Sequence, residues 1–267
     1  MLYQIRAQVR ENREVAPEVY RMSIHVPVIS HTARPGQFLH IRVDDSFDPL
    51  LRRPISINGV GREEGLVFLL YRVVGSGTQR LSEKKSGQNV DVLGPLGNGF
   101  TLQNPTRGAT LALIAGGMGI APLNFLLEEL KDSRSDVLVF LGAQTKESIL
   151  GEAGMAKMGY TPRVATDDGS FGYRGPVTDL FKESLNDRTT GFAYACGPPA
   201  MLRQVSVILQ KHNIPGEISL EERMGCGLGA CLSCVCKIKD PNSAGGFTYQ
   251  RACTEGPVFP VGEVLFE

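Results

Sequence analysis

Hydrophobic and polar residues alternate in short runs along the first hundred residues of the chain. This alternation is typical of strands that bury one face, and turns rich in Gly, Pro and Asp separate the runs by about 10–15 residues. Short strands at regular spacing indicate a small antiparallel β-barrel that ends near Phe100. The predicted strands are Tyr3–Val9, Val19–Val26, Phe38–Val43, Ile55–Val60, Leu66–Val73 and Asn89–Leu93.

The pattern changes after the barrel. Continuous apolar runs predict buried strands, and helical patterns lie between them. Strands that alternate with helices indicate a parallel α/β sheet, the architecture of many nucleotide-binding domains. The predicted strands are 110–115, 136–143, 163–168 and 192–197, and the predicted helices are Pro122–Lys131, Thr178–Glu183 and Pro199–Gln210.

The predicted elements divide the chain into three parts. Residues 94–108 are rich in Gly, Pro and Asn, so we interpret them as the linker between the barrel and the α/β region. A glycine-rich segment that begins near Gly216 holds five of the six cysteines. We therefore expect domains at residues 1–101, 102–215 and 216–267.

Composition excludes two classes of partner. The 28 Lys and Arg residues balance 28 Asp and Glu residues, so the chain lacks the basic charge of a dedicated nucleic-acid binder. The uncharged stretch 108–127 has the length of a membrane span, but three glycines and Pro122 would interrupt a lipid-exposed helix. The amino-terminal residues carry charges and no apolar stretch of signal-peptide length, so we expect a cytoplasmic protein without membrane contact.

The cysteine spacing points to a metal cluster. Cys226, Cys231 and Cys234 show the C-x4-C-x2-C spacing of plant-type [2Fe–2S] ferredoxins, and the glycines among them let one loop wrap tightly around two irons. Two cysteines remain for the fourth position. Cys236 follows Cys234 too closely and lies on an emerging strand, whereas Cys253 returns after a loop. The spacing therefore favours Cys253 as the fourth ligand.

Other uses of cysteine explain this pattern less well. A zinc site usually shows paired CxxC motifs, and only one is present here. Disulfides require an oxidising compartment, which the expected location does not provide. Burial as free thiols is the ordinary interpretation of Cys196 and Cys236 taken singly, but it does not account for three cysteines within nine residues.

Two segments of the barrel point to a flavin nucleotide. One is the R-P-x-S run that begins at Arg53, and the other ends in Gly77 and Thr78 ahead of a helix. An Arg fork can neutralise a pyrophosphate, a strand Ser can bond the isoalloxazine edge, and a Gly-Thr turn offers N–H groups to a phosphate. An edge-strand proline between charged surface residues is the alternative interpretation of the first run. The predicted flavin-binding residues are Arg53, Pro54, Ile55, Ser56, Leu70, Tyr71, Arg72, Gly77 and Thr78.

Two strand-to-helix turns in the α/β region predict a nicotinamide dinucleotide site. Gly116, Gly117 and Gly119 follow a strand and open a helix, so a pyrophosphate can approach the helix amino terminus. Their spacing is not G-x-G-x-x-G, and close packing of helix on sheet is the alternative explanation. Cys196 and Gly197 lie in the second turn, at the strand end where open α/β sheets bind ligands.

An acidic pair favours NAD over NADP. Asp167 and Asp168 follow the predicted strand at 163–168, where the adenosine ribose is expected. Carboxylates accept hydrogen bonds from ribose hydroxyls and repel a 2′-phosphate.

With these segments in order, the chain resembles the ferredoxin–NADP⁺ reductase superfamily. Within it, the chain is similar to the electron-transfer subunits of NAD-dependent (class 1B) dihydroorotate dehydrogenases of pyrimidine synthesis. Many flavoreductases have Tyr where Ile55 stands, and the isoleucine form is typical of this group. The segments that carry the resemblance are 35–43, 52–57, 71–78, 94–100, 115–123, 196–202 and the cysteine loop with Cys253.

The resemblance implies an electron relay. It implies one FAD, one [2Fe–2S] cluster and a heterotetramer of two such subunits with two FMN-bearing catalytic subunits. Electrons would pass from dihydroorotate through FMN, the cluster and FAD to NAD⁺, because flavin exchanges both pairs and single electrons. No residue of this chain is then needed as an acid, base or nucleophile. We expect solvated or packed side chains at His25, His31, His40 and His212.

A second interpretation keeps the flavin and nicotinamide sites but changes the partner. Diaphorase subunits of sulfhydrogenases or transhydrogenases share these segments, and their cluster loops often lack the first cysteine. The presence of Cys226 therefore favours the dihydroorotate branch. We expect the cluster loop, with Leu228, Leu232 and the turn at 245–247, to face the partner.

Overall fold

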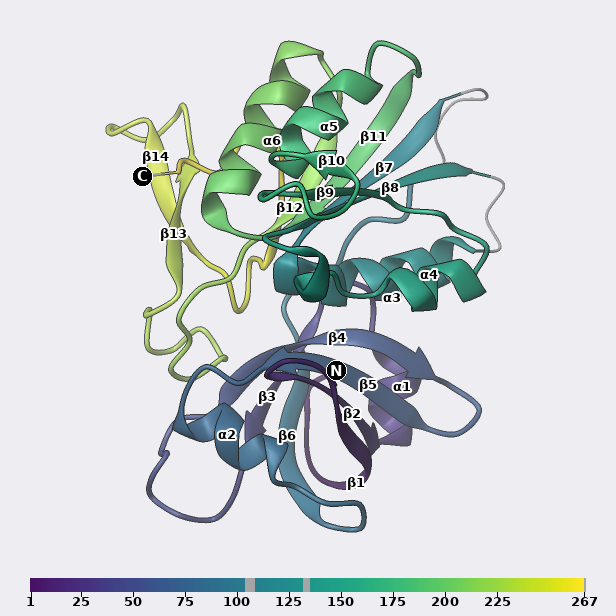
Figure 1. The fold of residues 1–267 in the computed structure, drawn as a ribbon. Coiled ribbons are helices and arrows are strands. Elements are labelled where there is room, and N and C mark those ends of the chain that lie inside the picture. The colour runs from purple at the N-terminus through teal and green to yellow at the C-terminus, as the bar shows by residue number, and fades with distance from the viewer. Residues whose placement is uncertain (104–108, 132–134, 267) are drawn as a thin grey trace.

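The computed structural model describes residues 1–103, 109–131 and 135–266 (Figure 1). A barrel, drawn in purple and blue, lies below an α/β domain, and the carboxy-terminal segment runs along one side of both. The expected linker at 94–108 is described as far as residue 103, and its remaining residues lie outside the described ranges.

Six antiparallel strands close the amino-terminal barrel in the order β1-β2-β5-β4-β3-β6. Their interior side chains alternate with outward ones, so aliphatic residues fill the barrel, as the alternation of the sequence predicts. The prediction of an antiparallel barrel is confirmed. The elements are β1 (Tyr3–Ala16), β2 (Val19–His25), α1 (Pro27–Thr32), β3 (Phe38–Arg42), β4 (Arg53–Gly61), β5 (Leu66–Arg72), α2 (Ser76–Ser82) and β6 (Asn89–Leu96).

Strand β3 separates two environments. Leu39 and Ile41 point into the barrel core and are fully buried. Phe38 faces outward, where it packs in a cluster with Cys234 and Cys253 of the carboxy-terminal segment. The outer face of β3 is therefore covered by the part of the chain that carries the cysteines.

The central domain is a seven-stranded sheet in the order β10-β9-β8-β7-β11-β12-β15. The first six strands in this order, from β10 through β7 to β12, run parallel to one another, which confirms the predicted parallel α/β architecture. Figure 1 shows α3 and α4 on the barrel side of the sheet and α5 and α6 on the other side. The elements are β7 (Thr110–Gly116), α3 (Ile120–Leu130), β8 (Asp136–Ala143), α4 (Glu152–Lys157), β9 (Arg163–Thr166), β10 (Tyr173–Arg174), α5 (Val177–Ser184), β11 (Thr190–Cys196) and α6 (Pro199–Lys211).

The carboxy-terminal segment contributes two strands to the central sheet. Strand β12 (Gly216–Ser219) pairs parallel to β11, and β15 (Val258–Pro260) pairs antiparallel to β12. Between them lie the cysteine loop and a separate hairpin of β13 (Val235–Lys239) and β14 (Phe247–Arg251). The expected boundary at residue 216 thus falls immediately before a strand of the nucleotide-binding sheet.

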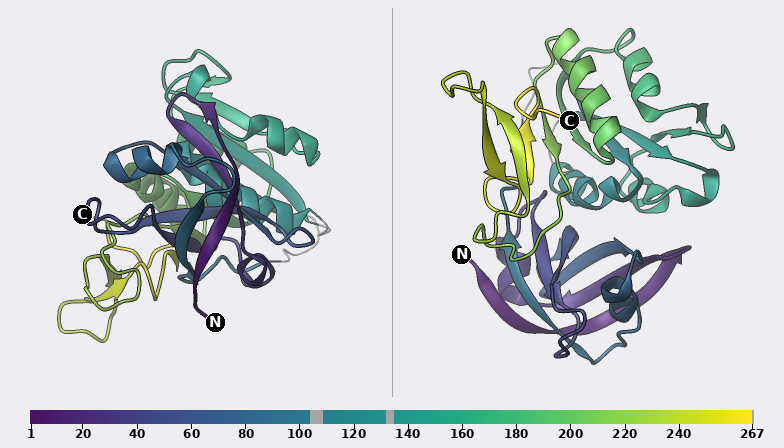
Figure 2. Two further views of the ribbon diagram at one scale, coloured as in Figure 1. Left: turned by 90° about the horizontal axis from the view of Figure 1, so that it is seen from below. Right: turned by 90° about the vertical axis from the view of Figure 1, so that its left-hand side faces the viewer.

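The cysteine loop spans the two main bodies of the molecule. In the side view of Figure 2, the segment between β12 and β13 descends from the central domain to the barrel. The uncharged stretch that has the length of a membrane span forms β7, a short turn and α3 where it is described. Within the described ranges, we find no helix with the length and apolar character needed to cross a bilayer.

Candidate functional site

A cavity of about 360 Å³ lies between the barrel and the central domain. Strands β4 and β5 form its barrel wall, and Met118, Glu221 and Met224 lie on the opposite side. Eight of the nine predicted flavin-binding residues line it: Arg53, Pro54, Ile55, Ser56, Leu70, Tyr71, Arg72 and Thr78. We call this space the flavin cavity.

Gly77 supports the flavin cavity without lining it. A Cβ added at this position would lie 2.6 Å from Nη2 of Arg53, so glycine leaves room for the guanidinium. The Thr78 hydroxyl accepts hydrogen bonds from the N–H groups of Val74 (2.9 Å) and Gly75 (3.2 Å). These two N–H groups therefore already have a hydrogen-bond acceptor within the turn, the Thr78 hydroxyl.

Tyr71 and Arg72 point to opposite faces of β5, as neighbours on a strand must. The Tyr71 ring enters the barrel, stacks on Tyr20 at 5.9 Å and donates a hydrogen bond from its hydroxyl to Asn12 Oδ1 (3.0 Å). Burial raises the pKa of the Tyr71 hydroxyl far above its ordinary value. Arg72 points to the other face and lines the flavin cavity.

A second cavity, of about 590 Å³, opens at the carboxyl ends of the central strands. Gly116, Gly117, Gly119, Asp167 and Gly197 line it, which brings together five of the seven predicted nicotinamide-site residues. We call it the dinucleotide cavity.

The other two predicted residues lie outside this cavity lining. Asp168 accepts hydrogen bonds from the N–H (2.9 Å) and hydroxyl (2.6 Å) of Ser170, so its carboxylate closes its own turn. Cys196 is buried beneath the cavity, and burial raises the pKa of its thiol strongly. The structure therefore separates the two aspartates, which the sequence treats as a pair.

The two predicted strand-to-helix turns meet in direct backbone contact. A Cβ added to Gly119 would overlap the Cys196 carbonyl group and lie 2.6 Å from the Gly197 nitrogen. Any side chain at this position would push apart the two turns that form the floor of the dinucleotide cavity.

Glu221 was missed by the sequence analysis. It lines both the flavin cavity and the dinucleotide cavity. The protein atoms around its carboxyl group partly exclude water and so raise its pKa, although the side chain reaches solvent. Its position just past β12 was the available signal, because ligands bind at the carboxyl ends of parallel strands. That strand was not predicted.

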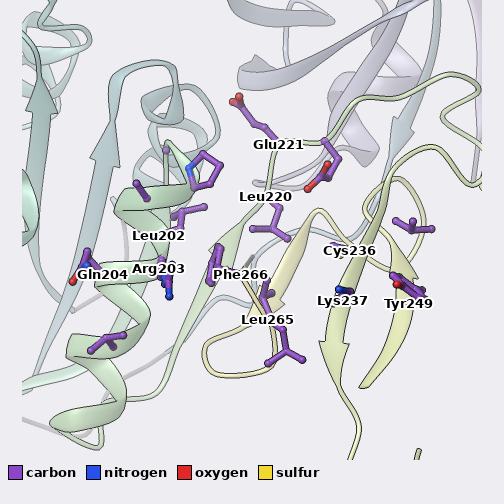
Figure 3. A pocket seen from close by; sticks show the side chains of 17 residues that line it. Leu202, Arg203, Gln204, Leu220, Glu221, Cys236, Lys237, Tyr249, Leu265 and Phe266 are labelled. Carbon is purple, nitrogen blue, oxygen red and sulfur yellow. The ribbon is translucent and has the colours of Figure 1, made fainter. Parts of the chain in front are cut away.

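A third and larger cleft adjoins the dinucleotide cavity. It measures about 920 Å³ and lies between α6, the hairpin of β13 and β14, and the carboxy-terminal residues. Figure 3 shows Arg203 of α6 on one side, with Lys237 and Tyr249 on the other and Glu221 at its upper end. Gly197 is the one predicted cofactor-binding residue among those that line it.

The four predicted ligand cysteines form two pairs. In the first pair, Cys226 Sγ accepts hydrogen bonds from the N–H groups of Leu228 (3.3 Å) and Cys231 (3.4 Å). The Ser233 hydroxyl lies 3.2 Å from Cys231 Sγ, and its hydrogen bond lowers the pKa of the exposed Cys231 thiol to about 6. Cys231 is therefore readily deprotonated, as metal ligation requires.

The second pair is buried. Cys234 and Cys253 lie in one apolar cluster with Phe38, and their thiols interact. Burial and the hydrogen bond with Cys234, together with the nearby Cys226, raise the pKa of Cys253 to about 11. Cys236 lies apart, because its thiol donates to the Gln250 carbonyl (3.5 Å) and packs in the core of the central domain.

Two pairs of thiols fit a [2Fe–2S] cluster, in which four cysteines hold two irons. The backbone N–H of Gly229, which lies between Cys226 and Cys231 in the loop, hydrogen-bonds to Cys253, so the loop of the first pair reaches the second pair. Within the described ranges, no three side chains of His, Cys, Asp or Glu are arranged as ligands of a single ion.

Protein-family models match two parts of the chain. Residues 221–265 match the iron-sulfur cluster binding domain of dihydroorotate dehydrogenase B, and residues 113–206 match the oxidoreductase NAD-binding domain. The electron transfer subunit of dihydroorotate dehydrogenase B (NAD(+)) from Desulforamulus reducens is 49% identical over 253 residues, which cover 95% of each chain. This chain belongs to the family of dihydroorotate dehydrogenase B electron transfer subunits. The family member from Shouchella clausii is 41% identical, over 97% of each chain.

Solved structures place the family's fold in a wider group. An NADH-dependent reduced ferredoxin-NADP oxidoreductase has a TM-score of 0.85 and 31% identity, over 97% of this chain and 90% of that one. A ferredoxin NADP⁺ reductase from Neisseria gonorrhoeae has a TM-score of 0.65 and 18% identity, over 78% of this chain and 91% of that one, and shows the fold alone.

Membership of the dihydroorotate dehydrogenase B electron transfer subunits settles the chain's class. It is an oxidoreductase subunit that transfers electrons, with a [2Fe–2S] cluster and FAD as cofactors and NAD as its nicotinamide partner. The predicted family, three-part architecture and cofactors are confirmed.

Proposed function

We propose that this chain passes electrons from an FMN-bearing dihydroorotate dehydrogenase subunit through a [2Fe–2S] centre and FAD to NAD⁺, in pyrimidine synthesis. One observation carries the proposal: the flavin cavity lies between the other two sites. It shares Met118 and Glu221 with the dinucleotide cavity, and Phe38 in its wall packs against the cysteines. A flavin bound there supplies the step between two-electron hydride chemistry and one-electron transfer.

The chain's own residues would bind and orient these groups. Arg53 and Arg72 supply positive charge for the FAD pyrophosphate, and Pro54, Ile55 and Ser56 present backbone and hydroxyl groups to the isoalloxazine edge. On the dinucleotide side, Gly116, Gly117, Gly119 and Gly197 admit a pyrophosphate close to the backbone. The proposed units are residues 1–101 for FAD, 102–215 for NAD and 216–267 for the cluster.

Cys226, Cys231, Cys234 and Cys253 are the proposed ligands of the cluster. In the first pair Cys231 is exposed and Cys226 is half-buried, whereas the second pair is buried against the barrel. One edge of the site is therefore open to a partner, and the other faces Phe38 of β3. Leu228 and Leu232 are exposed on the same loop. We assign this loop to the interface with the FMN-bearing subunit, in a cytoplasmic assembly of two chains of each kind, as the resemblance implies.

Co-purification with the partner tests this function. A tagged chain expressed in its own host should capture a dihydroorotate dehydrogenase subunit that carries FMN. The isolated complex should reduce NAD⁺ when dihydroorotate is added, and the chain alone should not, because in the proposed relay the FMN-bearing subunit oxidises that substrate. Failure to capture such a subunit would end the pathway assignment.

A second candidate function follows from the ferredoxin-NADP oxidoreductase structure, which matches almost the whole chain. In that case the chain would be the diaphorase-type subunit of another flavoenzyme complex. The same capture experiment separates the two, because the recovered partner would then bring different cofactors and no dihydroorotate-dependent reduction of NAD⁺.

We predict that Asp167 controls the preference for NAD over NADP. Asp167→Ser should lower the ratio of kcat/KM for NADH to that for NADPH by at least about tenfold, because one repulsive carboxylate and one ribose contact are lost. Asp168→Ser is the matched control, since that carboxylate is held by Ser170 in its own turn. Flavin reduction measured anaerobically with both nucleotides gives the ratios. Equal ratios in the Asp167 variant and the wild type would remove Asp167 from the ribose site.

A further inference from the structure

His40 occupies an unusual position on the outer face of β3. It is fully buried, and in the sheet it pairs with Pro54 of β4 and with Leu93 of β6. Pro54 belongs to the run of residues that lines the flavin cavity. The His40 backbone is thus part of the sheet that holds the proposed flavin site, while its side chain points away from the barrel core.

The His40 ring lies against the cysteine loop. A Cβ added to Gly227 would lie 2.6 Å from His40 Nδ1 and 3.3 Å from Cε1, so the ring abuts the residue that follows Cys226. Gly227 has a φ of 70°, which a residue with a side chain adopts at a cost. Both features keep the backbone of the loop in close contact with the imidazole.

Neither ring nitrogen of His40 makes a hydrogen bond of good geometry within the described ranges, although both atoms are buried and the backbones of Cys226 and Arg52 lie beside the ring. A buried polar atom left without a partner costs about 1–3 kcal/mol, so such atoms are rare in folded proteins. On one side the ring meets Cys226 and Gly227 of the loop that holds the proposed cluster, and on the other it meets the backbone of Arg52. Cluster sulfurs and ligand thiolates accept hydrogen bonds, and these bonds help to set the reduction potential.

We propose that His40 is a positioning residue of the iron–sulfur centre, whose ring N–H donates a hydrogen bond to a sulfur of that centre. Through this contact one side chain joins the strand pair beside the flavin cavity to the Cys226–Gly227 turn. The inference rests on the proposed function, because it requires the cluster to be held by this loop.

The reduction potential of the cluster tests the proposal. In His40→Phe, which keeps a ring and removes the donor, reduction of the cluster should become about tenfold less favourable, or ~59 mV for one electron. His40→Gln retains an N–H donor and should show a smaller shift. Leu93→Val is the matched control, because Leu93 packs beside the same cysteines without a polar group. Potentials are measured on the purified holoprotein by redox titration followed by electron paramagnetic resonance.

A second measurement does not depend on a variant's stability. Wild-type holoprotein with ¹⁵N-labelled histidine, reduced and examined by pulsed electron paramagnetic resonance, should show a weak coupling between the cluster and a histidine nitrogen. His40→Gln should abolish it. No coupling in the wild type, an unshifted potential in His40→Phe, or an equal shift in Leu93→Val would overturn the inference. A wild-type chain that binds no cluster would instead defeat the proposed function.

Discussion

Cys253→Ala is expected to lose the iron–sulfur centre while keeping its flavin. Cys253 lies with Cys234 in the buried pair, and three thiolates cannot complete the ligation of two irons. Iron content should fall more than tenfold, since even loss of groups that merely support metal ligands costs 10–100-fold in affinity, as a rough guide. Metal analysis and the visible spectrum of anaerobically purified protein measure iron and flavin separately.

Cys236→Ala is the matched control for this prediction. Both residues are buried cysteines beyond Cys234, so both substitutions remove one thiol of equal size. The Cys236 thiol donates to the Gln250 carbonyl, and Cys236 belongs to the apolar cluster of the central domain that includes Ile218 and Phe259, whereas Cys253 belongs to the cluster with Phe38. The Cys236 variant should therefore retain the full cluster spectrum and lose some thermal stability. Iron retained in Cys253→Ala and lost in Cys236→Ala would reverse the ligand assignment.

Local patterns in the sequence predict most of the fold. Alternation along β1 to β6 and the apolar runs of β7, β8 and β11 are strong because each strand has at least five residues with a consistent environment. Strands β12 and β15 have four and three residues, and their pairing depends on partners distant in sequence. No local pattern encodes a pairing with distant residues, so the place of these two strands in the central sheet becomes visible only in the structure.

The same distinction applies to the site. Residue types with a required spacing, such as the cysteines and the glycine turns, are recognisable without coordinates. Roles that depend on orientation are not: Tyr71 turns into the barrel, and Asp168 closes its own turn. Glu221 and His40 lie at junctions between elements that are far apart in the chain. Their environment is created by packing, so neither stands out in a linear pattern.

Gly119→Ala is expected to impair reduction of the flavin by NADH at least tenfold. Gly119 has an ordinary φ of −60°, so alanine causes no backbone strain there, and the effect comes from contact with the Cys196 carbonyl group and the Gly197 nitrogen. These atoms belong to a β-strand end and cannot rotate away as a side chain would. Overpacking of this kind costs about 1–3 kcal/mol, and it displaces both turns that line the dinucleotide cavity.

Gly154→Ala provides the contrast, because a Cβ there meets nothing within 4 Å and the residue lies in helix α4. Alanine in a helix is more favourable than glycine by about 0.5–1 kcal/mol, so this variant should be at least as stable as the wild type and reduce its flavin at the same rate. Stopped-flow reduction by NADH and thermal unfolding measure the two effects. Both variants should keep the cluster spectrum, because neither glycine touches the cysteine loop. A Gly119→Ala protein with wild-type hydride transfer would show that the two turns are not the floor of the nucleotide site.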